Sequence, residues 1–252
     1  MTDNHRLKDL VLHYQPVVNV DTKDVYGFEA LCRLQPASSP IILPNAFIPN
    51  LNCFQLNKLD IAVIKNCIST ASALQNSHPK SAIFINLNGL FNVRRWLIKA
   101  LLTILNDAVI VGDINPETIV FEVSEQTTFQ CNSHTLESIN ALKSLGFKIA
   151  LDDYGSKNSN LFRLCTIPCD FLKIDMSITH LLDSEIHRDR TIAILQSIRD
   201  FALQQGVIVI IEGIETESQH KTINELGFTL SQGYFYSKPQ PLSQLLPHKL
   251  CG

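Results

Sequence analysis

The chain has 252 residues, of which 45% are hydrophobic, enough to bury the core of one large domain or two small ones. Its formal net charge is −3, which argues against duplex DNA as a partner. We expect no signal peptide, and the apolar run at 207–211 is too short to span a membrane. The seven scattered cysteines favour reduced thiols in a cytoplasmic protein over disulfides or a zinc site.

The first two extended runs predict an antiparallel hairpin. Residues 11–20 and 25–34 are rich in apolar and β-branched residues, and the polar turn at 21–24 joins them. A proline-rich loop follows at 36–49. The apolar residues from 56 to 74 then recur at helical spacing, which predicts a helix with one buried face.

Strands and helices alternate from there. The remaining expected strands are residues 82–87, 118–124, 147–151, 170–174, 207–211 and 228–234. The expected helices are residues 93–105, 136–145, 161–165 and 186–205, and a last helix that begins at the capping box 216–219 and ends at Gly227. Gly146 and Gly206 fit the position just after a helix.

Eight strands with helices between most of them predict an α/β fold, a modified (β/α)8 TIM-like barrel with one antiparallel strand near the N-terminus. We expect residues 1–252 to form a single domain with a core at about 7–246. The alternative is a doubly wound open sheet, but no glycine-rich phosphate loop follows any expected strand.

Polar side chains stand at the ends of most expected strands, and the acidic pair after the run 149–151 is the most prominent. In a barrel these ends converge on one mouth. The residues brought together would be Glu29, Asn86, Glu122, Asp152, Asp153, Lys173, Glu212 and Gln232. Five carboxylates beside one lysine are hard to keep ionised without cations, and oxygen ligands suit Mg²⁺ or Mn²⁺. A pair of such ions is the usual device for cleaving a phosphodiester.

Each of these residues, taken singly, also has a simpler interpretation. Adjacent aspartates before a glycine are common in turns and at helix N-caps. Glu29 could be an exposed strand residue, Lys173 a solvated strand end, and Glu212 a residue that favours the next helix N-terminus. Asn86 and Gln232 could be turn or edge residues. The shared placement at strand ends is what favours a site.

These residues belong to a series of ordered motifs. The series comprises Tyr14-Gln15-Pro16, Glu29-Ala30-Leu31 with Arg33, Asn86-Leu87-Asn88, Glu122-Val123-Ser124-Glu125, Asp152-Asp153-Tyr154-Gly155, Lys173-Ile174-Asp175, Glu212-Gly213-Ile214-Glu215 and Gln232-Gly233-Tyr234. In this order the chain resembles the EAL-domain phosphodiesterases of bacterial cyclic di-GMP signalling, over about residues 7–246. The resemblance implies a modified (β/α)8 barrel, two Mg²⁺ or Mn²⁺ ions, a homodimer, and hydrolysis of cyclic di-GMP to linear pGpG.

The resemblance also assigns roles to single residues. One metal ion would be held by Glu29, Asn86, Glu122 and Asp152, and the other by Asp152, Asp153 and Glu212. Lys173 would contact the attacking water, and Glu212 is also the candidate general base. The substrate groove would use Gln15, Leu31, Arg33 and Gln232. Glu125, Asp175 and Glu215 would support the ligands from behind, with Glu125 anchoring the loop after Asp153.

The chain departs from the family pattern in one loop and at one further position. In the loop 156–160, Lys157 replaces an expected glycine and Asn158 an expected aromatic residue. Asn88 stands where the family usually has serine. The loop couples the metal site to the dimer interface in the family, so its change bears on activity.

Three functions remain open from the sequence. The complete ligand set favours a metal-dependent cyclic di-GMP phosphodiesterase. The altered loop leaves open a weak or inactive module that binds cyclic di-GMP or a protein partner. The same two-metal site could also act on another nucleotide or phosphodiester. The sequence does not decide whether the chain is a fragment of a longer sensor protein.

Overall fold

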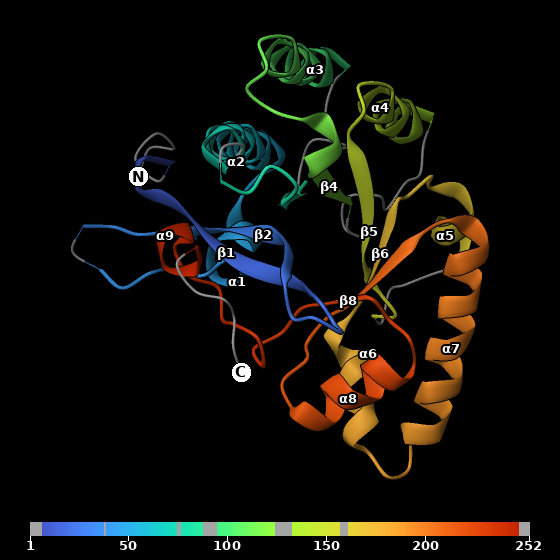
Figure 1. The fold of residues 1–252 in the computed structure, drawn as a ribbon. Helices are drawn as coiled ribbons and strands as arrows, with labels where there is room; N and C mark the ends of the chain where they lie inside the picture. The colour runs from blue at the N-terminus through green and yellow to red at the C-terminus, as the bar shows by residue number, and fades with distance from the viewer. Residues whose placement is uncertain are drawn as a thin grey trace.

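The computed structural model describes residues 7–37, 39–74, 77–87, 95–123, 133–156 and 161–246. Eight strands close into a barrel in chain order (Figure 1). They are β1 (Leu10–Asn19), β2 (Val25–Leu34), β3 (Ala82–Asn86), β4 (Ile119–Val123), β5 (Lys148–Tyr154), β6 (Phe171–Ile174), β7 (Ile208–Ile211) and β8 (Leu230–Ser231). β1 is antiparallel to both β2 and β8, and every other pair is parallel. The predicted modified barrel is confirmed, and β1 is its antiparallel strand.

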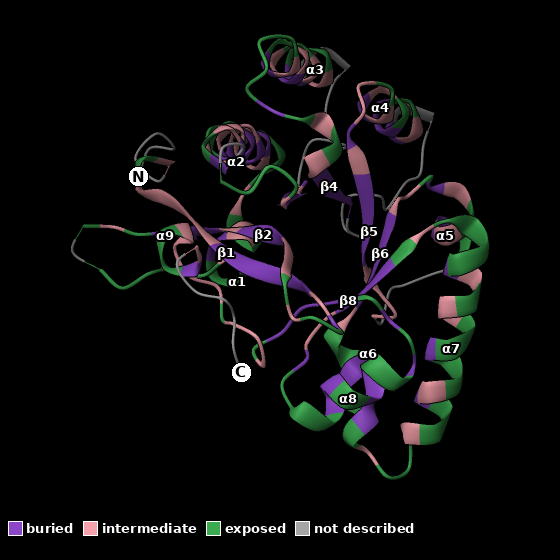
Figure 2. Cartoon of the chain, viewed as in Figure 1, coloured by how far each residue is buried: buried purple, intermediate pink, exposed green. Residues whose placement is uncertain are grey.

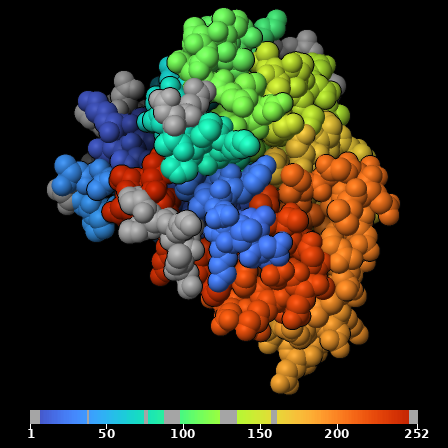
Figure 3. Space-filling model, in the orientation of Figure 1, coloured from blue at the N-terminus to red at the C-terminus, as the bar shows by residue number. Residues whose placement is uncertain are grey.

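The β1–β2 hairpin extends past the end of β3. β2 pairs with β3 only from Gly27 to Ala30, whereas its pairing with β1 continues to Leu34. The outer half of the hairpin therefore forms a two-stranded wall beside the barrel opening. The segment that follows β8 pairs with β1 at the base of this wall, through an isolated bridge between Tyr14 and Gln240. Figure 3 shows the blue hairpin in contact with the red C-terminal segment.

Helices cover the outside of the barrel. The longer ones are α2 (Cys53–Leu74), α3 (Arg95–Ile110), α4 (Ser133–Ser144), α7 (Arg188–Gln205) and α8 (Glu217–Glu225). Shorter turns are η1 (Leu7–Asp9), α1 (Pro44–Phe47), η2 (Ile48–Asn50), η4 (Pro116–Thr118), α5 (Leu161–Thr166), α6 (Met176–His180), η6 (Leu181–Asp183) and α9 (Leu242–Leu245). α7 ends at Gly206 with φ 68°, and α8 begins with the expected capping box of Thr216 and Gln219. Of the helices described, none is long and apolar enough to cross a lipid bilayer.

The structure differs locally from the expected elements at β8 and at α6 (Met176–His180). The last strand was expected over residues 228–234, but β8 has only two residues. The chain leaves the sheet at Gly233, which packs so closely on the turn after β7 that an added Cβ would lie 2.0 Å from the carbonyl oxygen of Ile214. The helix α6 has no counterpart among the expected elements; it has five residues, and the side chain of Asp175 caps it by accepting from the backbone N–H of Ser177.

The core has two layers, and Figure 2 shows buried residues both on the strands and on the helices around them. The larger layer lies between the barrel and its helices. The smaller layer fills the barrel interior with Val17, Ala82, Phe84, Val120, Ala150, Phe171, Ile210 and Leu230. Nearly every strand contributes to this plug, which closes the barrel below its mouth and gives the residues above it a rigid apolar floor.

Candidate active site at the mouth of the barrel

Most polar residues of the mouth stand two positions along the chain from a residue of the barrel interior. Side chains of a strand alternate between faces, so the residue two places after an interior one also points inward. The step is Phe84 to Asn86, Val120 to Glu122, Ala150 to Asp152, Phe171 to Lys173, Ile210 to Glu212 and Leu230 to Gln232. β1 runs the other way, so Gln15 precedes Val17 by two. Strand periodicity therefore gathers side chains from seven separate strands into one cluster.

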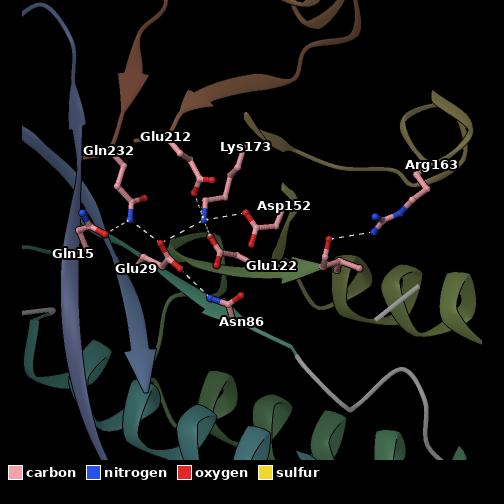
Figure 4. A network of polar contacts seen from close by, with 10 residues as sticks. Gln15, Glu29, Asn86, Glu122, Asp152, Arg163, Lys173, Glu212 and Gln232 are labelled. Carbon is pink, nitrogen blue, oxygen red and sulfur yellow. Dashed lines mark hydrogen bonds and ion pairs between the residues drawn. The ribbon is translucent and has the colours of Figure 1, made fainter. Parts of the chain in front are cut away.

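Lys173 is the centre of this cluster (Figure 4). Its side chain is 1% exposed, and its Nζ lies near four carboxylates from four other strands or strand ends. The distances are 2.6 Å to Glu122, 2.9 Å to Glu212, 3.3 Å to Asp152 and 3.5 Å to Glu29. One buried ammonium thus faces four buried or half-buried carboxyl groups.

Amide side chains fix the orientation of Glu29. Asn86 Nδ2 donates to Glu29 Oε1 at 3.0 Å, and Gln232 Nε2 donates to Glu29 Oε2 at 2.7 Å. Gln232 Nε2 also lies 3.0 Å from Gln15 Oε1, and Gln15 Nε2 donates to the carbonyl of Ser237 at 3.1 Å. Residues far apart in sequence therefore hold this carboxylate in one rotamer.

A β-bulge lets two adjacent aspartates face the same site. The register of β5 against β6 shifts between Leu151 and Tyr154, and Asp153 has φ 56°. Neighbouring residues of a regular strand point to opposite faces, so Asp153 would otherwise point away from the mouth. The bulge and the left-handed backbone turn it back, and ligand atoms of Asp152, Asp153 and Glu212 lie within 4.8 Å of one another.

Burial and mutual repulsion make several of these carboxyl groups hard to ionise. Burial, reinforced by Asp152 and Glu29 against the effect of Lys173, raises the pKa of Glu212 to about 8. Burial and the neighbouring Asp152 raise the pKa of Asp153 to about 6. At neutral pH the Glu212 carboxyl therefore mostly keeps its proton, and positive charge entering the mouth would favour its release.

Glu29 and Glu122 differ in how easily they ionise. Burial opposes ionisation of Glu29, but Lys173 and the hydrogen bonds from the two amides outweigh it and lower its pKa. Burial and the nearby Glu29 raise the pKa of Glu122 well above its ordinary value. Burial disfavours the ammonium of Lys173, yet the surrounding carboxylates outweigh it and raise its pKa well above the ordinary value.

The donor set fits divalent metal ions. Every side chain around Lys173 offers oxygen, the ligand atom that Mg²⁺ and Mn²⁺ prefer. Glu122 Oε2 is buried and has no hydrogen-bond partner among the described residues. A buried carboxylate oxygen without a partner is costly, and a metal ion would satisfy it. The residues present therefore fit a metal centre.

A cleft of about 250 Å³ leads from solvent to this cluster. Its lining includes residues expected from the sequence, Gln15, Glu29, Leu31, Asp153, Asp175, Glu212, Glu215 and Gln232, together with Met176, Gly213, Gly233 and Tyr234. A second cavity of about 190 Å³ shares Glu29 and Leu31 with it and reaches Asn86. Met176 carries no signal in the sequence, because its place in the cleft depends on the unpredicted helix α6.

Some expected residues lie away from the cluster. Arg33 is 7% exposed, donates from Nη1 to the carbonyl of Cys32 at 2.8 Å, and is not part of the cleft lining. Asp175 caps α6, and Glu215 is exposed, with its carboxylate 4.0 Å from His180 Nε2. Glu125, Asn88 and positions 157–160 of the altered loop lie outside the described residues.

The chain is similar to known proteins over most of its length. The model of the EAL domain family matches residues 2–239. The chain belongs to the EAL domain family. The cyclic di-GMP phosphodiesterase RocR of Pseudomonas aeruginosa is 25% identical over 240 residues, covering 94% of this chain and 59% of RocR. The curated relatives are longer proteins, of which this EAL domain chain spans between 28% and 59%.

Solved EAL structures have the same fold. The phosphodiesterase PaMucR in complex with c-di-GMP superposes with a TM-score of 0.77 at 26% identity, covering 97% of this chain and all of that one. The manganese and cyclic di-GMP complex of BlrP1 from Klebsiella pneumoniae gives a TM-score of 0.76 at 25% identity, covering 92% of this chain and 56% of BlrP1. Members of the family thus bind cyclic di-GMP and metal ions at this fold.

Proposed function

We propose that this EAL domain is a metal-dependent phosphodiesterase that hydrolyses cyclic di-GMP to linear pGpG with two Mg²⁺ or Mn²⁺ ions. The observation that carries the proposal is the complete acidic cluster around Lys173 at the mouth of the barrel. Relatives named as cyclic di-GMP phosphodiesterases support this substrate, and the cleft that opens onto the cluster would give access to it.

The mouth residues divide into two ligand sets that share Asp152. Glu29, Asn86, Glu122 and Asp152 would hold one ion, and Asp152, Asp153 and Glu212 the other. When bound, the ions supply Lewis acidity that neutralises phosphoryl charge and lowers the pKa of water. The proposed assignment agrees with the unpartnered Oε2 of Glu122 and with the close approach of the three ligand atoms at the β5 bulge.

The chemistry is the addition of water across one phosphodiester bond. A water oxygen bonds to phosphorus, the bond from phosphorus to the ribose 3′ oxygen breaks, and the leaving oxygen gains a proton. Lys173, held by ion pairs, would orient the water with an N–H group. Glu212 would accept its proton; burial raises the pKa of this carboxyl to about 8 while the mouth holds no metal ion.

Substrate contacts are proposed along the cleft. Gln15, Leu31 and Gln232 line it and would touch the nucleotide. Arg33 would reach a phosphate with the part of its guanidinium fork that does not donate to Cys32. Asp175 and Glu215 would act from the rim of the cleft, and Glu125 through the loop that it anchors.

We also propose a homodimer, with α5 as the contacting face. Leu161 and Phe162 on this helix are 66% and 64% exposed, which is unusual for two adjacent large apolar side chains. Light scattering at micromolar concentration would give twice the chain mass, and Phe162→Arg would lower it to the monomer mass. A monomeric parent contradicts the dimer. The cytoplasmic location remains a prediction from the sequence.

The test of the enzyme is product formation. The purified chain is incubated with cyclic di-GMP and Mn²⁺ or Mg²⁺, and the nucleotides are separated by chromatography. Linear pGpG is expected from the parent and from Glu217→Ala, which changes an exposed glutamate of α8. No product is expected from Glu29→Ala. Metal-independent binding of cyclic di-GMP by the parent, with no pGpG over hours, would instead indicate a binding module.

A further inference from the structure

The turn that carries Glu212 has no regular pairing of its own beyond β7. Glu212 follows the last residue of β7, and Gly213 turns the chain with φ 70°. The backbone N–H of Glu212 donates to the carbonyl of Ile174 at 3.1 Å, and that of Ile214 to the carbonyl of Gln232 at 3.1 Å. These two hydrogen bonds hold the start and the end of the turn, whereas the carbonyl of Glu212 accepts its hydrogen bond from outside the sheet.

The helix α6 packs directly on the turn. Its first residue, Met176, lies so close to Gly213 that a Cβ on the glycine would be 2.3 Å from the Met176 Cβ. Near its end, the hydroxyl of Thr179 donates to the carbonyl oxygen of Glu212 at 2.6 Å. Thr179 is 1% exposed, so water does not replace this bond readily.

The next segment holds the far side of the same turn. Asp183 in η6 accepts a hydrogen bond from Gln219 Nε2 at 2.7 Å. Gln219 Oε1 in turn accepts from the backbone N–H groups of Glu215 and Thr216 at 2.7 and 3.1 Å. The segment from Met176 to Asp183 thus holds the turn at both ends, and Thr179 is its one contact to the peptide group of Glu212 itself among the hydrogen bonds described.

We propose that Thr179 is a positioning residue of the metal site. Its hydroxyl fixes the Glu212 peptide group and, through it, the carboxylate that lies 2.9 Å from Lys173 and joins Asp152 and Asp153. β6 thereby contributes twice: it delivers Lys173 into the mouth, and the helix after it holds Glu212 against that lysine. The consequence for metal binding rests on the proposed function, whereas the hold on the turn does not.

The test compares Thr179→Val, which removes the hydroxyl at nearly constant volume, with Thr179→Ser, which keeps it. Thr191→Val is the matched control, because Thr191 is 4% exposed and its hydroxyl donates to the carbonyl of His187, the residue just before α7. Hydrogen exchange of the peptide covering 212–216 is measured without added metal, and Mn²⁺ affinity is measured by titration calorimetry. Both readouts are independent of turnover.

In Thr179→Val, exchange of 212–216 is expected to be roughly two- to tenfold faster, as the loss of one hydrogen bond implies. Mn²⁺ affinity is expected to fall about tenfold or more, as is typical when a group behind a metal ligand is removed. Thr179→Ser and Thr191→Val should match the parent in both. Unchanged exchange in Thr179→Val, or faster exchange with unchanged Mn²⁺ affinity, overturns the proposal. Faster exchange and weaker Mn²⁺ binding in a chain that makes no pGpG would support Thr179 and contradict the phosphodiesterase.

Discussion

Removing the ammonium of Lys173 should destabilise the metal-free protein strongly. Lys173→Met keeps the length of the side chain but leaves Glu29, Glu122, Asp152 and Glu212 facing one another without a cation. Breaking a buried ion pair by removing one partner costs ~3–5 kcal/mol. A protein of this size loses ~2–4 °C of melting temperature per kcal/mol, so a fall of roughly 6–20 °C is expected. Protonation of the carboxyl groups limits the loss, so the effect should be largest above pH 8.

The chain contains a matched control for this experiment. Lys143 also lies 2.6 Å from a carboxylate, that of Asp170, but the two side chains are 30% and 25% exposed. Partly exposed pairs contribute up to ~1 kcal/mol, so Lys143→Met should lower the melting temperature by only a few degrees. Thermal unfolding is followed by circular dichroism in EDTA and again with Mn²⁺.

Mn²⁺ should narrow the difference between Lys173→Met and the parent, because metal ions restore positive charge to the mouth. If Lys173→Met loses no more stability than Lys143→Met in EDTA, the cluster does not depend on the buried ammonium. That result would contradict the large stabilisation that we expect from the buried ion pairs of Lys173.

Other predictions concern the same mouth. The free energy of unfolding without metal should fall as the pH rises from about 5 to 8. The reason is that burial raises the pKa of the Glu212 carboxyl from 4.5 to about 8, so the folded protein keeps this proton after the unfolded chain has lost it. Glu212→Gln should flatten this dependence in urea titrations, and a free energy of unfolding that rises with pH in the parent would contradict it. Mn²⁺ binding to the parent at pH 7 should release protons, and calorimetry in two buffers measures their number. Binding to Glu212→Gln should release fewer protons. Equal release from the two proteins would show that the Glu212 carboxyl is already ionised before the metal binds. Gly213→Ala should destabilise the protein more than Gly112→Ala in thermal melts, because both glycines have positive φ but only Gly213 packs against Met176; equal losses would mean that the contact is not tight.

Much of the fold follows from local patterns in the sequence. The eight strands and the antiparallel start were predictable because apolar runs, short polar turns and helix caps are encoded locally. The gathering of Glu122, Asp152 and Lys173 also follows, since each stands two positions after an interior residue of a parallel strand. Their roles as ligands and as a water contact remain predictions.

What the sequence did not predict depends on contacts between distant segments. The sequence analysis expected Asp153 in the mouth, but it did not predict the bulge between β5 and β6 that turns this residue inward, and the only local sign of the bulge is the tolerance of aspartate for φ 56°. The brevity of β8 results from the packing of Gly233 on the turn after β7. The hydrogen bond from Thr179 to Glu212 joins residues 33 positions apart through a helix too short to show periodicity.

The central claim is that the mouth of this EAL domain holds two metal ions. Crystals grown with Mn²⁺ and measured near the manganese absorption edge would locate the ions by anomalous scattering. The account predicts two peaks, one among Glu29, Asn86, Glu122 and Asp152 and one among Asp152, Asp153 and Glu212. It is contradicted if Mn²⁺ binds outside the mouth, or if Lys173 remains paired with all four carboxylates and no peak lies beside them.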